Sequence, residues 1–188
     1  MARQLFILRH AKSAWDTNAA SDFDRPLAKR GQKDVPLMGA WMREQKMVPD
    51  CVISSPAERA RQTASGVCHV LDIKEKKIYW DRRVYGADTE ELLEVLSELP
   101  SKVKSVLLVG HNPGLESLAA YLVGDLSQKA AQLISHSGAT EGEAGEYGVV
   151  KTATLLQLET DEEWSALKQR CAALIQVKYP RELYPSAS

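Results

Sequence analysis

Two histidines and two arginines stand where short apolar segments of the chain end. His10, preceded by Arg9, follows the first apolar run, and His111 follows the run Val-Leu-Leu-Val. Arg59 comes shortly after a third apolar run. A neutral imidazole can attack phosphorus to form a phosphohistidine, and a guanidinium group binds phosphate oxygens in bidentate fashion. These residue types therefore indicate phosphoryl-transfer chemistry.

The elements that must position these side chains follow from hydrophobic patterning. Short apolar runs alternate with segments of helical periodicity, which predicts an α/β fold: a three-layer α/β/α sandwich around a mostly parallel sheet. Because the carboxyl ends of parallel strands share one edge of a sheet, we expect the histidines and arginines to meet there. Strands are expected at Leu5–Leu8, Cys51–Ile53, Val106–Val109, Thr154–Leu158 and Ile175–Tyr179, with Lys77–Trp80 at an edge.

Helices are expected between these strands. The clearest patterns lie at Ala57–Leu71, Thr89–Leu99 and Pro113–Val123. A further helix is expected to begin with Asp34 as its cap, because Pro36 then falls in the first turn, where a missing N–H costs nothing. The stretch Ser135–Gly148 is rich in Gly, Ser, Ala and Glu, which predicts a flexible surface loop.

Composition limits the classes of protein to which the chain can belong. Its 188 residues predict a single domain spanning 1–188, and 44% hydrophobic with 26% charged residues excludes intrinsic disorder. A net charge of −1 predicts no nucleic-acid or membrane partner. Three cysteines without a CxxC pair favour reduced thiols over a disulfide framework or a zinc site. Together with the lack of a long apolar segment, this favours a cytoplasmic protein.

The motifs around these residues resemble those of a known family. The run from Arg9 to Trp15 resembles the RHG/RHA signature of the histidine phosphatase (phosphoglycerate mutase-like) superfamily. The block from Ser54 to Ala64 is similar to its second motif, and Gly110-His111-Asn112-Pro113 to its third. Arg25-Pro26-Leu27 and the late Pro180-Arg181-Glu182-Leu183 look most like the SixA-type phosphohistidine phosphatases.

The resemblance implies roles for individual residues. His10 would be the phosphorylated nucleophile, and Arg9, Arg59 and His111 would be catalytic residues that hold the phosphate. Ser13 is a further candidate hydrogen-bond donor to the phosphate. No metal and no cofactor is implied. Of the other histidines, neither His69 nor His136 is expected to take part in the chemistry.

The chain departs from the family in its proton donor. Mutase-like relatives supply a Glu from an inserted segment, whereas only 51 positions separate Arg59 from His111 here. Asp88, Glu90 and Glu91 lie in the corresponding stretch, and no motif selects one of them. An alkoxide leaving group needs a well-placed acid, whereas the nitrogen of a phosphohistidine leaves more easily. The missing insertion therefore favours an activated phosphate as the substrate.

We therefore predict a metal-independent phosphatase that forms a phosphohistidine at His10 and removes phosphate from phosphohistidine on a protein. One alternative is a small-molecule phosphomonoesterase or a phosphoglycerate mutase-like enzyme acting on a small phosphorylated metabolite. Another is a non-catalytic phosphate-binding module. The substitution His10→Ala separates these classes, because an enzyme loses turnover whereas a binding module keeps most of its affinity.

Overall fold

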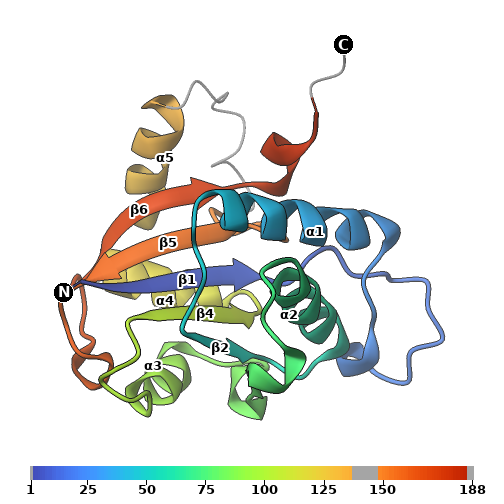
Figure 1. Cartoon of the computed structure of the whole chain (residues 1–188), viewed down its shortest axis with the longest axis horizontal. Coiled ribbons are helices and arrows are strands. Elements are labelled where there is room, and N and C mark those ends of the chain that lie inside the picture. The colour runs from blue at the N-terminus through green and yellow to red at the C-terminus, as the bar shows by residue number, and fades with distance from the viewer. Residues whose placement is uncertain (1, 137–147, 186–188) are drawn as a thin grey trace.

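A six-stranded sheet forms the centre of the computed structural model, which describes residues 2–136 and 148–185. The strand order is β3-β2-β4-β1-β5-β6 (Figure 1). The first four strands in this order run parallel, β5 is antiparallel to β1, and β6 is antiparallel to β5. The strands are β1 (Arg3–Arg9), β2 (Cys51–Ser54), β3 (Ile78–Trp80), β4 (Ser105–Gly110), β5 (Leu155–Thr160) and β6 (Ala173–Lys178). The predicted α/β fold with a mostly parallel sheet is confirmed.

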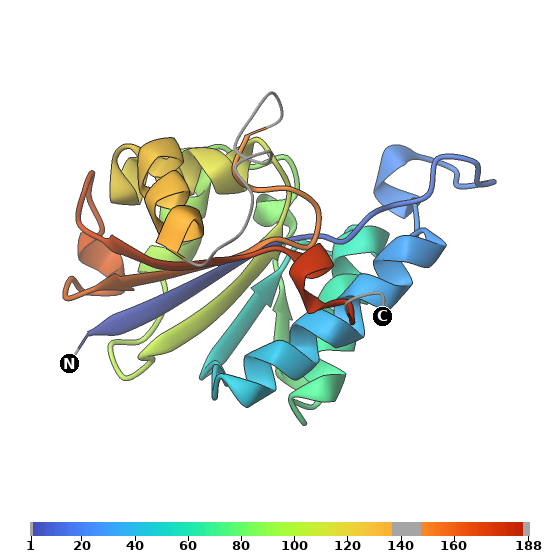
Figure 2. The ribbon, with the colours of Figure 1, turned by 90° about the horizontal axis from the view of Figure 1, so that it is seen from above.

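Helices cover both faces of the sheet. Figure 2 shows α1 and α2 on one side and α4 and α5 on the other. The strands serve both faces, because alternate side chains point in opposite directions: Phe6 and Leu8 pack towards α1 and α2, whereas Leu5 and Ile7 pack towards α3 and α4. The helices are α1 (Lys29–Glu44), α2 (Glu58–Val70), α3 (Thr89–Ser97), α4 (Gly114–Val123) and α5 (Leu126–His136).

Helix α1 begins earlier than predicted. Asp34 is not its cap but a buried residue inside it, where its carboxylate accepts a hydrogen bond from the hydroxyl of Tyr184 at 2.7 Å. Pro36 also lies inside the helix and not in its first turn. The helix starts at Lys29 because its N-terminus docks on the segment after β1, where the N–H of Ala28 donates to the carbonyl of Lys12 at 2.8 Å. A tertiary contact therefore outweighs the local capping signal.

Helix α5 was not predicted, although its apolar spacing is helical. Leu126, Ala130 and Ile134 recur every fourth residue and are buried. Gly124, at φ +95°, separates α5 from α4. Residues with a side chain rarely adopt this backbone conformation. The predicted loop 135–148 overlaps the end of α5, and its residues 137–147 lie outside the described residues. In the described parts of the chain, no helix is long and apolar enough to cross a membrane.

Candidate active site

The pairing of β1 with β4 brings the two histidines together. In this parallel pair Arg9 is opposite Gly110, so the next residue of each strand, His10 and His111, leaves the sheet at the same edge. The N–H of His10 donates to the carbonyl of Gly110 at 3.0 Å. The two imidazole rings have their centroids 5.1 Å apart. The expectation that both rings meet at the carboxyl edge of the sheet is therefore met.

A backbone contact fixes which nitrogen of His10 carries the proton. Nδ1 of His10 lies 2.8 Å from the carbonyl oxygen of Ala11. A carbonyl oxygen can only accept a hydrogen bond, so Nδ1 is the donor and Nε2 of the neutral ring carries a lone pair. Nε2 faces Nε of Arg59 at 3.4 Å. Nε2 is therefore the nitrogen available as a nucleophile.

Both histidines are held in the neutral form. Burial, followed by the charges of nearby arginines, lowers the pKa of His10 to about 4, although the hydrogen bond to Ala11 acts in the opposite direction. Burial and the neighbouring His10 lower the pKa of His111 to about 3. Both effects disfavour the imidazolium, because it is poorly solvated and repelled by like charge. An unprotonated imidazole is the form that can attack phosphorus.

Arg59 connects His10 to a carboxylate. It lies in the first turn of α2 and is 7% exposed. While its Nε points to His10, its Nη1 donates to the carbonyl oxygen of Asp22 at 2.6 Å and its Nη2 to the Asp22 carboxylate at 2.8 Å. These contacts hold the guanidinium in a fixed orientation beside the ring.

Asp22 lies in a short 3-10 helix, η1 (Asp22–Asp24), and is contacted by three side chains of the site. Besides Arg59, its carboxylate accepts from Nη1 of Arg25 at 2.7 Å and from the hydroxyl of Tyr85 at 3.1 Å. Desolvation acts to raise its pKa, but the hydrogen bonds and charges of Arg25 and Arg59 lower it overall. Asp22 is therefore ionised at neutral pH and cannot serve as a proton donor.

His111 is fixed by the loop that follows β2. Its Nε2 lies 2.8 Å from the hydroxyl oxygen of Ser55, and this oxygen accepts a hydrogen bond from the N–H of Ala57 at 3.2 Å. The ring of Tyr85 packs edge-on against His111, with the centroids 5.3 Å apart. The remaining nitrogen of His111, Nδ1, is buried and has no partner among the described residues.

Arg9 contributes a second, half-buried positive charge. Its Nη1 donates to the carbonyl of Val150 at 2.9 Å, while its Nε is buried without a partner in the described part of the chain. Burial lowers its pKa, and the carboxylate of Glu116 acts in the opposite direction. The positive charge of Arg9 also contributes to the lowered pKa of both His10 and His111.

Ser13 is placed differently from the other predicted residues. Its hydroxyl accepts from Nη2 of Arg25 at 2.7 Å, and no hydrogen bond between described residues joins it to His10. Arg25 in turn stacks over the ring of Trp15, 3.7 Å from its centroid. The structure therefore brings together Arg9, His10, Arg59 and His111. Ser13 is hydrogen bonded to Arg25 and not to these four residues.

The candidate proton donors are engaged in local structure. The carboxylate of Asp88 accepts from the N–H of Glu91, and the carboxylate of Glu91 accepts from the N–H of Asp88, which is a capping box at the start of α3. Glu90 is exposed in the first turn of the same helix. No described contact joins these three carboxylates to His10 or His111.

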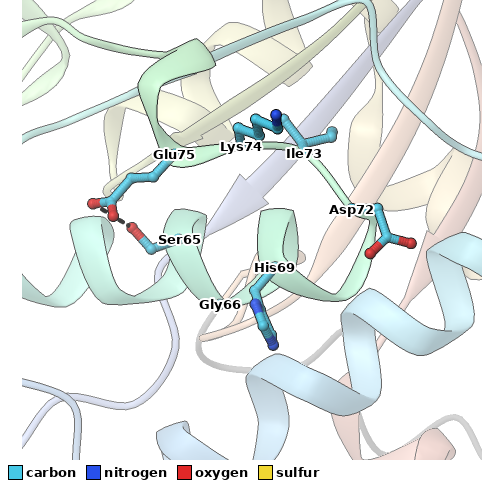
Figure 3. Close-up of a pocket in the computed structure, with 7 residues that line it drawn as sticks. All are labelled: Ser65, Gly66, His69, Asp72, Ile73, Lys74 and Glu75. Atoms are coloured by element: carbon cyan, nitrogen blue, oxygen red, sulfur yellow. Dashed lines mark hydrogen bonds between the residues drawn. The ribbon is translucent and has the colours of Figure 1, made fainter.

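A pocket of about 750 Å³ lies away from this site, beside the second half of α2 (Figure 3). Figure 3 shows the exposed imidazole of His69 pointing away from Ser65 and Glu75, which hydrogen bond to each other at 3.3 Å. His69 is ten residues from Arg59 along the helix, or about 15 Å. Within residues 2–136 and 148–185, no group of three His, Cys, Asp or Glu side chains is arranged to hold a metal ion.

The chain is similar in sequence to known phosphatases. Residues 5–82 match the model of the histidine phosphatase superfamily (branch 1). The phosphohistidine phosphatase SixA of Escherichia coli is 35% identical over 124 residues, covering 65% of this chain and 73% of that protein. An uncharacterized protein of Mycobacterium tuberculosis is 33% identical over 177 residues, covering 93% of this chain and all of that protein.

Solved structures show the same likeness along nearly the whole chain. A protein of Nakamurella multipartitia assigned as the phosphohistidine phosphatase SixA superposes with a TM-score of 0.75 at 28% identity, covering 96% of this chain and 97% of that one. The protein histidine phosphatase SixA in complex with tungstate superposes with a TM-score of 0.73 at 25% identity, covering 96% and 99%.

Proposed function

Because this chain belongs to the histidine phosphatase superfamily, and is thus a phosphatase, we propose that it dephosphorylates phosphohistidine on a protein through a phosphohistidine intermediate at His10, without a metal. The observation that carries this proposal is the state of the His10 ring. Its Nδ1 is committed to the carbonyl of Ala11, and the lone pair of its Nε2 faces the guanidinium of Arg59.

The first step is an attack of Nε2 of His10 on the phosphorus of the donor. A bond forms between Nε2 and phosphorus while the bond between phosphorus and the donor's nitrogen breaks, and its electron pair leaves with that nitrogen. In the second step water attacks the phosphorus. Its protons go to the solvent and the phosphate product, the Nε2–phosphorus bond breaks, and His10 is regenerated in its starting form.

The charged residues around the ring stabilise the transferring group. Three phosphoryl oxygens carry the negative charge of the transition state, and fixed positive donors lower its energy most. Arg59 lies beside Nε2 of His10, and the charge of Arg9 acts on both rings. In this proposal the Ser55 hydroxyl donates to Nε2 of His111, so Nδ1, which has no partner among the described residues, carries the ring proton and donates it to a phosphoryl oxygen.

The leaving group explains the choice of substrate. The carboxylate that binds Arg59, Asp22, is ionised, and Asp88 and Glu91 cap α3, so none of these three described carboxylates is ready to protonate an alkoxide. A phosphohistidine whose distal ring nitrogen is already protonated leaves as neutral imidazole and needs no such acid. The site therefore favours cleavage of a P–N bond over cleavage of an unactivated phosphate ester.

A comparison of donors tests this function. Purified protein is assayed on a phosphohistidine peptide, a phosphoserine peptide of the same sequence and a small phosphomonoester, each with and without a chelator. We expect kcat/KM for the phosphohistidine peptide to exceed the others by about a hundredfold or more, unchanged by the chelator. Faster hydrolysis of the monoesters would contradict the proposed substrate, and loss of activity with the chelator would contradict metal independence.

A further inference from the structure

A positively charged pocket of about 220 Å³ includes Lys12, two residues beyond the proposed catalytic histidine, in its lining. It is lined by Lys12, Arg30, Lys151, Thr152, Tyr179, Pro180 and Arg181. Four of these seven residues are cations and none is an acid. They come from the loop after β1, the start of α1, the loop before β5 and the segment after β6. Four separate elements thus converge to concentrate positive charge at one place.

The pocket borders the backbone that carries His10. Lys12 is two residues beyond His10, so their Cα atoms are within about 7 Å. On the other side, Thr152 precedes Ala153, whose N–H lies within hydrogen-bond distance of the carbonyls of Arg9, at 3.1 Å, and His10, at 3.2 Å. The pocket is therefore within reach of a peptide whose phosphoryl group is held at His10.

The surroundings of the pocket strengthen its positive character. Arg30 lies in the first turn of α1, whose cap residue Ala28 makes no side-chain capping hydrogen bond, so the helix N-terminus adds partial positive charge. Two acids border the pocket, and each has a cationic partner. Asp34 is 3.8 Å from Nε of Arg30 and also accepts from Tyr184, whereas Glu182 accepts from the N–H of Tyr179 at 2.8 Å and lies 3.6 Å from Nζ of Lys178. Burial raises the pKa of Tyr179 to about 12, so this wall stays uncharged.

We propose that this pocket binds acidic side chains of the phosphorylated protein, close in sequence to its phosphohistidine. An extended peptide advances about 3.3 Å per residue. A Glu or Asp two or three positions from the phosphohistidine would therefore reach Lys12 and Lys151. The inference rests on the proposed function, because it takes the phosphoryl group at His10 as the anchor of the peptide.

Two phosphohistidine peptides that differ only in charge test the pocket. One carries Glu, and the other Gln, at the second and third positions on each side of the phosphohistidine. We expect the wild-type chain to prefer the Glu peptide about five- to tenfold in kcat/KM at low salt, and less at high salt. The double variant Lys12→Gln/Lys151→Gln should lose this preference while keeping its rate on the Gln peptide.

A matched variant controls for overall charge. Lys76 and Lys102 are exposed and lie outside the pocket, so Lys76→Gln/Lys102→Gln should keep the wild-type preference. The proposal is overturned if the wild type shows no preference, or if the Lys12/Lys151 variant keeps it.

Failure of the proposed function has a different signature. In that case neither phosphohistidine peptide is hydrolysed by any form of the chain. Binding of the unphosphorylated Glu and Gln peptides, measured by fluorescence anisotropy, then decides on the pocket alone. Tighter binding of the Glu peptide by the wild type and the control, but not by the Lys12/Lys151 variant, supports the pocket, and equal binding of both peptides overturns it.

Discussion

The carboxylate of Asp22 lies 2.8 Å from Nη2 of Arg59, the residue whose Nε points to His10. The carbonyl oxygen of the same aspartate accepts from Nη1 of Arg59, so one residue binds both terminal nitrogens of the guanidinium. This contact determines the direction in which the Nε–H of Arg59 points. We therefore regard Asp22 as a positioning residue for Arg59.

Removing this carboxylate tests its role. We expect Asp22→Ala to lower kcat/KM about tenfold. Arg59 loses a charged hydrogen bond, and its more mobile side chain must be ordered again when phosphate binds. Asp22→Asn keeps a hydrogen-bond acceptor and should lose less. Asp24 is exposed in the same short helix and hydrogen bonds to Ser21, so Asp24→Ala is the matched control.

A rise in kcat/KM in Asp22→Ala would have the opposite meaning. The carboxylate would then compete with phosphate for the guanidinium, and Asp22 would not be a positioning residue.

The hydroxyl of Ser55 should matter for the chemical step. Ser55→Ala removes the partner of Nε2 of His111, so the proton of that ring is no longer directed to Nδ1. We expect kcat to fall about tenfold with little change in KM. Ser65→Ala, at a half-buried serine of α2 that hydrogen bonds to Glu75 away from the site, should leave both constants unchanged. Equal behaviour of the two variants in steady-state kinetics would exclude this role.

The buried histidines make the stability of the fold depend on pH. Their folded-state pKa values, about 4 for His10 and about 3 for His111, lie below the ordinary value of 6.5. As the pH falls from 7 through 6.5 towards 4, the unfolded chain takes up protons that the folded chain does not. The free energy of unfolding therefore decreases over this window.

Urea unfolding at pH 7 and pH 5 measures this effect. We expect each histidine to contribute a loss of roughly 1–2 kcal/mol between these values. The double variant His10→Asn/His111→Asn should lose correspondingly less stability than the wild type. The same pH dependence in both proteins would show that these rings are not buried in the neutral form.

A close contact at the start of α1 predicts a sensitive glycine. A Cβ atom added to Gly31 would lie 2.3 Å from the carbonyl oxygen of Lys12, which is backbone and cannot easily move. We expect Gly31→Ala to destabilise the fold by about 1–3 kcal/mol, measured by urea unfolding. Gly86 has open space around its Cβ position, but its φ of +71° disfavours a side chain. Ala28→Gly, at the neighbouring cap, is therefore the better control and should cost less.

The sequence alone predicted the parts of the site that follow directly from strands. His10 and His111 come immediately after β1 and β4, and the pairing of these strands brings the rings together without any contribution from loops. Arg59 follows from the same logic, because it is the second residue of the helix after β2. Three short motifs in order were enough to indicate the family.

The residues that the sequence analysis missed lie on irregular segments. Asp22 and Arg25 belong to the loop between β1 and α1, whose path is set by contacts such as the N–H of Ala14 donating to the carbonyl of Pro26 at 2.9 Å. Tyr85 follows the short 3-10 helix η3 (Arg82–Val84). Such segments lack the regular spacing of apolar residues from which the strands and helices were predicted. The charged residues around Asp22 indicate a polar segment, but they do not indicate which residues of the chain it contacts.

The start of α1 shows the same limit for secondary structure. Asp34 and Pro36 form a plausible capping signal, yet the helix extends six residues further towards the N-terminus because its end docks on the carbonyl of Lys12. Local signals were correct where the chain is held by its own hydrogen bonds. They failed where a distant segment provides the partner.

The central claim is that the phosphoryl group passes through Nε2 of His10, and trapping the phosphoenzyme tests it most directly. The wild-type chain and His10→Ala are mixed with a radiolabelled phosphohistidine peptide, quenched in alkali within the first turnover and analysed for protein-bound label. The account predicts label on the wild type that is stable in alkali, lost in acid and located at His10 by peptide mapping, with none on His10→Ala. Turnover without any trapped label on the wild type, or the same label on His10→Ala, would contradict it.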